Sequence, residues 1–434
     1  MAITMRKRHA EADVYRPLME SRQEIRLLRI HASLSFKSPI KCDLIQTPLD
    51  HALDFQALSY VWGNKVDKSS ISVLGTDFPV TRNPFEALIR LRQKTRTLII
   101  WIDAAKGVLV WLGEKIGNSD LAFRLIRTWA KYALDNRPDT LVQLYKHTEF
   151  EPYVFDYRAW DAAKELFERD WWFRVWVYQE FVLAQEATFV YGPDRISWLA
   201  LRHAMQAWTY VQSPTVTGYF TIAYRHLVEN CRFEVARQFI SDREKMVAAH
   251  IGTNPHLLAL PWLVDNLRFL RSTDPRDKVY ALLGVADTEN LVIDIDYSKS
   301  VHEVYAKYIW AVAQKDHCLN VLAQAGLARD GRSSDLRLPS WVPDLRTACL
   351  ATTKLQQAEH WPSGCETAKY DLSADLSTLT ISGSTFDSIQ ELEQELHSGP
   401  NTDLRVWRDL AFKSGLKTHP AGIPLHQAFF RTII

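Results

Sequence analysis

The acidic residue Glu180 lies in a segment, Trp172–Ala184, that is otherwise dominated by apolar and aromatic residues. Apolar positions cover nearly the whole circumference of a helix over this range, so the sequence predicts a buried helix. A buried carboxylate is costly unless it is paired or hydrogen-bonded, and burial raises its pKa, as is common for catalytic acids and bases. Two interpretations stay open: a structural ion pair with Arg169 or Arg174, or a catalytic or ligand-binding carboxylate.

Four further candidates for ligand binding are Tyr60, Trp62, Gly63 and Asp103. They lie at or just beyond the C-terminal ends of two predicted strands, and ligands of open α/β sheets bind at that edge. Aromatic packing, and for Asp103 the capping of a following helix, would explain the same residues at least as well.

Other kinds of chemistry lack the residues that they need. The five cysteines have neither zinc-ligand nor CxxC spacing, and no GxGxxG, Walker A, GxSxG or HExxH pattern is present. We therefore expect no metal and no bound cofactor. Helix capping explains the charged cluster Asp274, Arg276 and Asp277, and Glu114 is predicted to be a solvated turn residue.

Short apolar runs predict the elements that would position these residues. Strands are predicted at 25–30, 55–62, 98–102, 108–112 and 187–191, with a hairpin over 71–80. Helices are predicted from Asn83-Pro84, over 119–134, 160–168 and 172–184, and from a capping box at Ser300 and Glu303. Continuous runs such as 98–102 suit strands buried on both faces, so we expect an open, mainly parallel α/β sheet with flanking helices. Beyond about residue 195 the pattern is mainly helical.

Composition excludes several classes of partner. The chain has 434 residues, 47% of them hydrophobic, and its formal net charge of +1 gives no basic surface for nucleic acid or an anionic membrane. The basic N-terminus, Met1–Asp13, lacks the apolar core of a secretory signal, and the longest apolar run is too short to span a bilayer. We expect a cytoplasmic protein without membrane insertion.

Six stretches in register resemble proteins with the heterokaryon-incompatibility (HET) domain of filamentous fungi. They are Phe55–Gly63 (FQALSYVWG), Leu98–Ala104 (LIIWIDA), Val108–Gly113 (VLVWLG), Arg169–Ala184 (RDWWFRVWVYQEFVLA), Ser272–Gly284 (STDPRDKVYALLG) and Leu338–Asp344 (LPSWVPD). The resemblance implies a HET domain over residues 1–195, with its core at about 55–192 and an N-terminal strand at about 25–30. Residues 196–434 would form a mainly helical region.

Two departures from the family pattern suggest an incomplete copy. In the family, the WIDA strand continues into a Cys-Ile-Asn-Gln segment and a helix before the VLVWLG strand, whereas only Ala105, Lys106 and Gly107 separate Ala104 from Val108 here. Adjacent parallel strands need a crossover of about a dozen residues, so three residues would leave a hairpin or one fused strand. The segment 428–432 resembles a motif that continues in relatives, so we also expect the C-terminal region to be incomplete.

The family implies a role in allorecognition and programmed cell death. HET domains resemble TIR domains, and Trp176–Glu180 is similar to the segment that carries the catalytic glutamate of NAD-cleaving TIR proteins. This implies that Glu180 could stabilise a cationic ribose while NAD, as substrate, loses nicotinamide. The alternatives are a non-catalytic module that oligomerises or binds a protein partner, and an inactive degenerate copy.

Overall fold

The computed structural model describes most of the first 350 residues and a short segment beyond them. The described residues are 18–19, 22, 24–51, 54–64, 66–101, 107–134, 156–211, 233–250, 258–288, 291–316, 319, 322, 325, 336–347 and 369–382. The chain divides into two compact units, Met1–Thr380 and Ile381–Ile434. The elements named below lie in the first unit, except for the last residue of strand β13.

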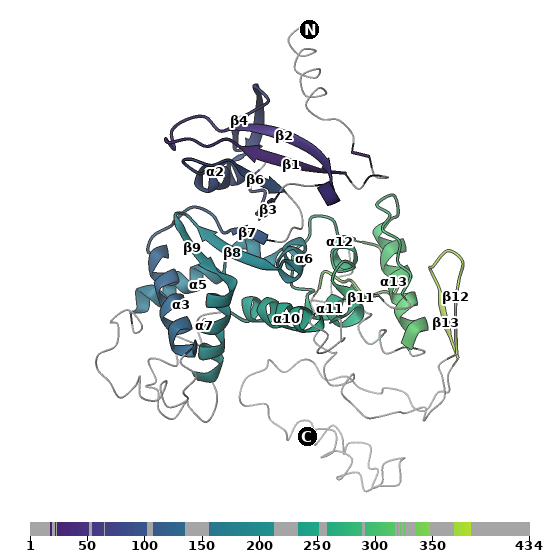
Figure 1. Cartoon of the computed structure of the whole chain (residues 1–434). Coiled ribbons are helices and arrows are strands. Elements are labelled where there is room, and N and C mark those ends of the chain that lie inside the picture. The colour runs from purple at the N-terminus through teal and green to yellow at the C-terminus, as the bar shows by residue number, and fades with distance from the viewer. Residues whose placement is uncertain are drawn as a thin grey trace. The chain divides into compact units, whose positions relative to one another are not determined.

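A nine-stranded sheet forms the centre of the first unit (Figure 1). Its strands are β1 (Glu24–Ile30), β2 (Lys41–Pro48), β3 (Gln56–Ser59), β4 (Lys68–Val73), β5 (Thr76–Thr81), β6 (Leu98–Trp101), β7 (Gly107–Trp111), β8 (Glu186–Tyr191) and β9 (Asp194–Ser197). Their spatial order is β5-β4-β2-β1-β6-β3-β7-β8-β9. The three predicted strands β3, β6 and β7 therefore lie side by side in one sheet, as expected.

The sheet is mixed rather than mainly parallel. Strands β6, β3, β7 and β8 form a central parallel block, whereas β1 is antiparallel to both of its neighbours, β2 and β6. The outer strands β5 and β9 are also antiparallel to their neighbours, because tight turns connect them to β4 and β8. The α/β class is confirmed, but the sheet is not mainly parallel, because parallel pairing is confined to the central block and the β2–β4 pair.

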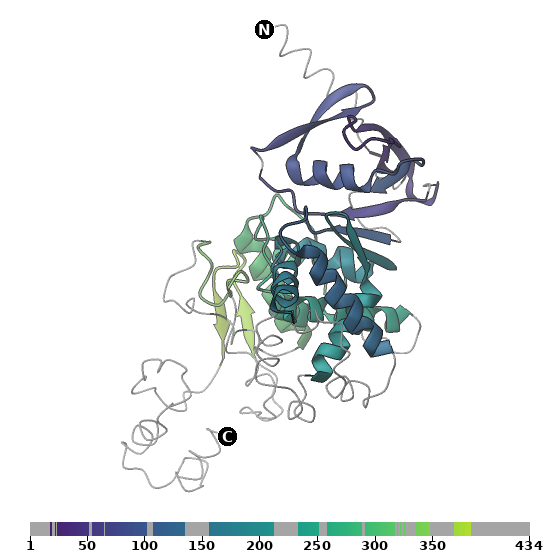
Figure 2. The same cartoon turned by 90° about the vertical axis from the view of Figure 1, so that its left-hand side faces the viewer.

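Alternating side chains give the sheet two separate apolar faces. Leu58, Ile100 and Leu109 pack with the helix α2 (Arg82–Leu91) on one face. Ala57 and Val108 point to the opposite face. The helices that pack there are α3 (Ser119–Leu134), α5 (Tyr157–Phe167), α6 (Val175–Leu183), α7 (Trp198–Val211) and α10 (Glu234–His250). Figure 2 shows the purple and blue strands of the N-terminal half of the sheet curving around α2.

The segment predicted as one buried helix over 172–184 is divided in two. Asp170–Phe173 forms a 3-10 turn, and α6 begins only at Val175. The break occurs at Arg174, whose extended backbone forms a β-bridge with Arg271, so that the backbone N–H of Val175 donates to the Arg271 carbonyl at 3.0 Å. A helical Arg174 would lose this pairing with the downstream chain.

Strands β6 and β7 are joined by a link of only five residues, 102–106, which lies outside the described residues. Both strands pair in parallel with β3, on opposite sides of it, and Trp101 and Val108 are both level with Ala57. The facing ends of the two strands therefore lie about two strand spacings apart, roughly 10 Å, whereas six Cα steps reach roughly 20 Å. The expectation of a hairpin or a fused strand is wrong, because β6 ends at the level where β7 begins.

The chain after the sheet contributes short elements and one long helix. They are β10 (Leu258–Ala259), α11 (Leu260–Asn266), α12 (Asp277–Tyr280), β11 (Ala286–Asp287), α13 (Val301–Asp316), β12 (Tyr370–Leu372) and β13 (Leu379–Ile381). The predicted capping box is confirmed: the Ser300 N–H donates to Glu303 Oε2 at 2.9 Å, and the Glu303 N–H donates to Ser300 Oγ at 3.2 Å. The helix that follows the predicted cap at Asp274 is short, since α12 begins only at Asp277 and ends at Tyr280. Asp274 accepts hydrogen bonds from the N–H and the guanidinium of Arg276 in the turn before α12. A mainly helical region and a boundary near residue 195 stay predictions.

Candidate functional site

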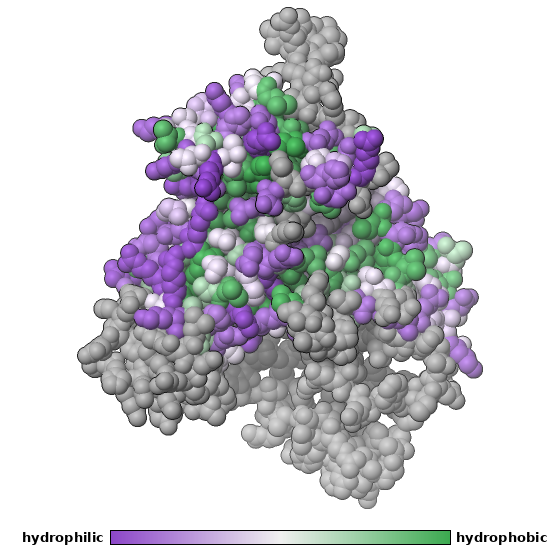
Figure 3. Space-filling model, viewed as in Figure 1, coloured by the Kyte–Doolittle hydropathy of each residue, from purple (hydrophilic) through white to green (hydrophobic). Residues whose placement is uncertain are grey.

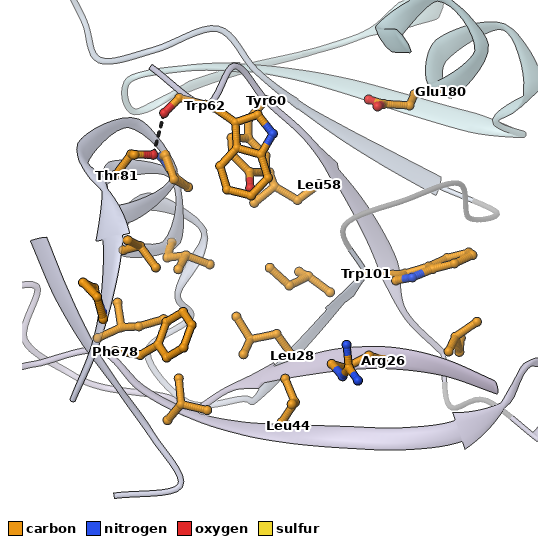
Figure 4. A pocket seen from close by; sticks show the side chains of 18 of the residues that line it. Arg26, Leu28, Leu44, Leu58, Tyr60, Trp62, Phe78, Thr81, Trp101 and Glu180 are labelled. Carbon is orange, nitrogen blue, oxygen red and sulfur yellow. Dashed lines mark hydrogen bonds between the residues drawn. The ribbon is translucent and has the colours of Figure 1, made fainter. Parts of the chain in front are cut away.

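A cavity of about 840 Å³ lies between the curved N-terminal half of the sheet and the helix α6 (Figure 4). Side chains from β1, β2, β3, β4, β5, β6, α2 and α6 line it. Tyr60, Trp62 and Glu180, which the sequence places far apart, all belong to this lining. The cavity therefore reaches from the face covered by α2 to the C-terminal ends of β3 and β6, the edge at which ligands of α/β sheets bind.

Glu180 reaches the cavity because one face of α6 is not fully covered. Val175, Val177 and Tyr178 are buried, whereas the row formed by Trp176, Gln179 and Glu180 is only half-buried. The expectation of burial around the whole circumference is therefore wrong for this row. Figure 4 shows the carboxylate of Glu180 directed into the cavity, on the side opposite Arg26.

Tyr60 and Trp62 follow β3 and form a second wall. Tyr60 is buried, Trp62 is 55% exposed, and their ring centroids lie 5.2 Å apart. The hydroxyl of Thr81 donates to the Trp62 carbonyl, and the Asn83 amide donates to the carbonyl of Val61. These two bonds attach the end of β3 to the first turn of α2 and fix the two rings at the cavity.

The other two predicted ligand-binding residues are not seen in the cavity wall. Gly63 has φ +71°, and an added Cβ would lie 3.3 Å from the Cβ of Asn83, so this position requires glycine for backbone reasons. It is not among the lining residues. Asp103 lies outside the described residues.

The cavity wall includes two functional candidates that the sequence analysis did not select. Trp101 ends β6, and Arg26 lies on β1, which pairs antiparallel with β6. Arg26 shares its face with Leu28, and Figure 4 shows it beside Trp101. The tryptophan could have been proposed from its position at a strand end, but Arg26 could not, because nothing in the sequence indicates that β1 pairs with β6.

The two arginines proposed as ion-pair partners of Glu180 differ in position. Arg169 donates a hydrogen bond to the Tyr191 hydroxyl and packs over that ring, with its Cζ 4.6 Å from the centroid. Arg174 lines the same cavity as Glu180. Glu114 is not the solvated turn residue expected, because it accepts two hydrogen bonds from the guanidinium of Arg90, each of 2.7 Å.

Comparison with known proteins relates this geometry to one family. The family model for heterokaryon incompatibility protein (HET) matches residues 55–105, which include β3, β6 and the wall formed by Tyr60 and Trp62. The chain is also 23% identical over 414 aligned positions to heterokaryon incompatibility protein 6, OR allele, of Neurospora crassa. These matches support a HET-domain protein. No solved structure matches.

Both matches cover only part of the sequences compared. The alignment covers 75% of this chain and 58% of the Neurospora protein, so the chain spans less than two thirds of that relative. The family match ends at Ala105, within the short link between β6 and β7. That is the position at which the family pattern predicts a missing segment, and the deletion itself stays a prediction.

Hydrogen bonds hold α6 of the HET-domain protein from three directions. Before the helix, Trp171 Nε1 donates to Ser59 Oγ of β3 at 2.7 Å, and both residues are buried. Within it, the Tyr178 hydroxyl donates to Asp242 Oδ2 at 2.9 Å. At its C-terminal end, Arg243 donates to the carbonyls of Phe181 and Gln185. These bonds restrain the helix that carries Glu180.

Burial determines the titration of the groups behind α6. Desolvation, reinforced by the charge of Asp242 and the hydrogen bond to it, holds the pKa of Tyr178 well above its usual range, so this phenol stays protonated. Desolvation also lowers the pKa of Arg243 from 12.5 to about 10, but the side chain stays charged at neutral pH. It lies over the rings of Phe181 and Trp198, which favours the cation.

Three further observations concern the surface, membrane-spanning helices and metal ligands. The face in Figure 3 is mainly hydrophilic at its outer edges, whereas hydrophobic residues reach the surface nearer its middle. Among the residues that the structure describes, no helix is long and apolar enough to cross a membrane. In the same part of the chain, no group of three or more His, Cys, Asp or Glu side chains is arranged to hold a metal ion.

Proposed function

We propose that this chain acts in heterokaryon incompatibility, as an allorecognition protein that triggers programmed cell death in a filamentous fungus. The HET family match and the Neurospora relative, which is named for heterokaryon incompatibility, support this proposal. The cytoplasm is the compartment that the proposal requires, since incompatibility follows the mixing of two cytoplasms.

The proposed output is cleavage of NAD at the bond between nicotinamide and ribose. The observation that carries this step is the placement of Glu180, Tyr60 and Trp62 on one cavity, whose volume of about 840 Å³ lies in the range of small-molecule sites. As nicotinamide leaves, positive charge builds on the ribose carbon, and a carboxylate beneath it stabilises that charge. The rings of Tyr60 and Trp62 offer apolar surface to a flat heterocycle. This chemistry needs no metal.

The experiment that tests this step compares two glutamine substitutions. Glu180→Gln keeps the size of the side chain and removes its charge, so we expect nicotinamide release to fall by at least a hundredfold while the melting temperature holds or rises. Glu165→Gln changes an exposed glutamate of α5 and serves as the matched control. The wild type must first turn over NAD, in a form with the missing family segment restored if necessary. Turnover by Glu180→Gln equal to that of the control would contradict the catalytic role.

A second candidate is a non-catalytic module that binds a protein partner or a second copy of itself. Exposed apolar side chains near the cavity favour it: Trp62 is 55% exposed, Val66 87% and Leu74 56%. In that case, cell death in a fungal host would persist with Glu180→Gln and would be lost with Trp62→Ser and Val66→Ser. Loss with Glu180→Gln and persistence with Val66→Ser would favour the enzyme.

A further inference from the structure

The cavity has an apolar part that the proposed NAD chemistry does not use. The lining residues there are Leu28, Leu44, Leu58, Ile71, Val73, Phe78, Val80, Leu88 and Ile100. They come from six strands and α2, and Figure 4 shows Leu28, Leu44 and Phe78 together at one end. A dinucleotide is polar along its sugars and phosphates and has no aliphatic portion to place against such a surface.

Charged side chains line other parts of the same cavity. Figure 4 shows Arg26 and Trp101 on one side and Glu180 on the other. Arg174, which immediately precedes α6, lines the cavity as well. The charged side chains of the lining are the cations Arg26, Lys68 and Arg174 and the carboxylates Glu24 and Glu180. This excess of one positive charge favours an anionic group, and arginine binds carboxylates through two parallel hydrogen bonds.

We propose that the cavity binds a single-chain aliphatic carboxylic acid. Its hydrocarbon chain lies against the apolar end, and its carboxylate lies near Arg26 and Arg174. A ligand of this kind would occupy the same cavity as NAD, so it would act as an inhibitor of the proposed reaction. The inference rests on the part of the proposed function that makes this cavity a ligand site, but not on NAD cleavage.

The first test is a chain-length series on the full chain. Binding of hexanoate, octanoate, decanoate and dodecanoate is measured by calorimetry, each below its micelle concentration. Each CH₂ group moved from water to an apolar wall contributes about 0.8 kcal/mol, so the dissociation constant should fall about fourfold per CH₂ until the apolar end is full. Alcohols of the same lengths should follow the same slope with weaker binding, because they lack the charge that Arg26 and Arg174 recognise.

The second test uses two pairs of variants. Val80→Phe fills the apolar end and should weaken dodecanoate binding at least tenfold, whereas Val292→Phe adds the same bulk at a side chain that is 86% exposed and outside the lining, and should have no effect. Arg174→Gln should weaken the acids but not the alcohols, with Arg96→Gln, on an exposed loop, as its control. If Val80→Phe fails to fold, the chain-length series and the variants Arg174→Gln and Arg96→Gln still test the proposal.

Three results would overturn the proposal: affinity independent of chain length, equal binding of acids and alcohols, or unchanged binding by a folded Val80→Phe. None of these measurements involves NAD. A protein that cleaves NAD but binds no acid contradicts only this inference, and one that binds acids but does not cleave NAD contradicts only the enzymatic proposal.

Discussion

Lys278 gives a stability prediction whose size follows from the structure. The side chain is only 6% exposed, and its Nζ donates to the backbone carbonyls of Arg268, at 2.7 Å, and Leu270. Desolvation lowers its pKa from 10.5 to about 8, with smaller contributions from Arg268 and Arg346, while Asp344 acts in the opposite direction. Between about pH 8 and pH 10.5, Lys278 is protonated in the unfolded chain and deprotonated in the folded chain.

The free energy of unfolding should therefore rise with pH across this interval, because stability increases wherever the unfolded state binds more protons. The difference between 10.5 and about 8 corresponds to about 3 kcal/mol. Below about pH 8 both states are protonated and this contribution is constant. Lys278→Met removes the titrating group, so the stability of the wild type relative to the variant should increase by about 3 kcal/mol from pH 8 to 10.5.

The measurement is urea unfolding followed by circular dichroism at four pH values from 7.5 to 10.5 for both proteins. Taking the difference between the two proteins cancels the titration of the tyrosines and other lysines. A difference that stays constant over the whole range would refute the reasoning. It would mean that the two carbonyl acceptors keep Lys278 protonated, so that their hydrogen bonds to the ammonium group offset its desolvation.

Two further predictions concern the backbone around the sheet. Gly192→Ala should destabilise the protein by about 2–4 kcal/mol in thermal unfolding, because φ is +56° and an added Cβ would lie 2.8 Å from the Cβ of Lys115. Gly117→Ala, at φ +52° with no atom within 4 Å of the added Cβ, should cost only about 1 kcal/mol, and equal losses would contradict the steric argument. Inserting the family's segment after Ala104 should raise soluble yield and melting temperature, since it would cover apolar strand surface. Unchanged values would show that the short link is accommodated, and transcript sequencing across Ala104–Val108 would tell whether the deletion is real.

The sequence predicted most of the strands and missed β2 and β9. Strands β6 and β7 are short continuous apolar runs, which suit strands buried on both faces. Strand β2 escaped prediction because only Cys42 among its residues is buried, and β9 because it has four residues and one buried side chain. Both are held by pairing with a neighbour, which leaves little trace in composition.

The sequence could indicate the lining residues that follow a strand or lie on an apolar helix. It could not indicate those whose position depends on which strands pair with each other. Tyr60, Trp62 and Glu180 line one cavity, and their role in ligand binding stays a prediction. The half-buried row on α6 could not be foreseen, because hydrophobicity alone does not distinguish a wall of a cavity from a packed core. The contribution of Arg26 depends on the antiparallel pairing of β1 with β6, a long-range contact.

The short link between β6 and β7 bears on how this protein can vary among individuals. Both strands are held in register by β3, and both are level with Ala57. Insertions or deletions between Trp101 and Gly107 can therefore occur without shifting either strand. Such changes would alter the chain next to Trp101, which lines the cavity. Alleles that differ only in this interval would share one scaffold and still differ in what their cavity admits, which is a route to many specificities from one fold.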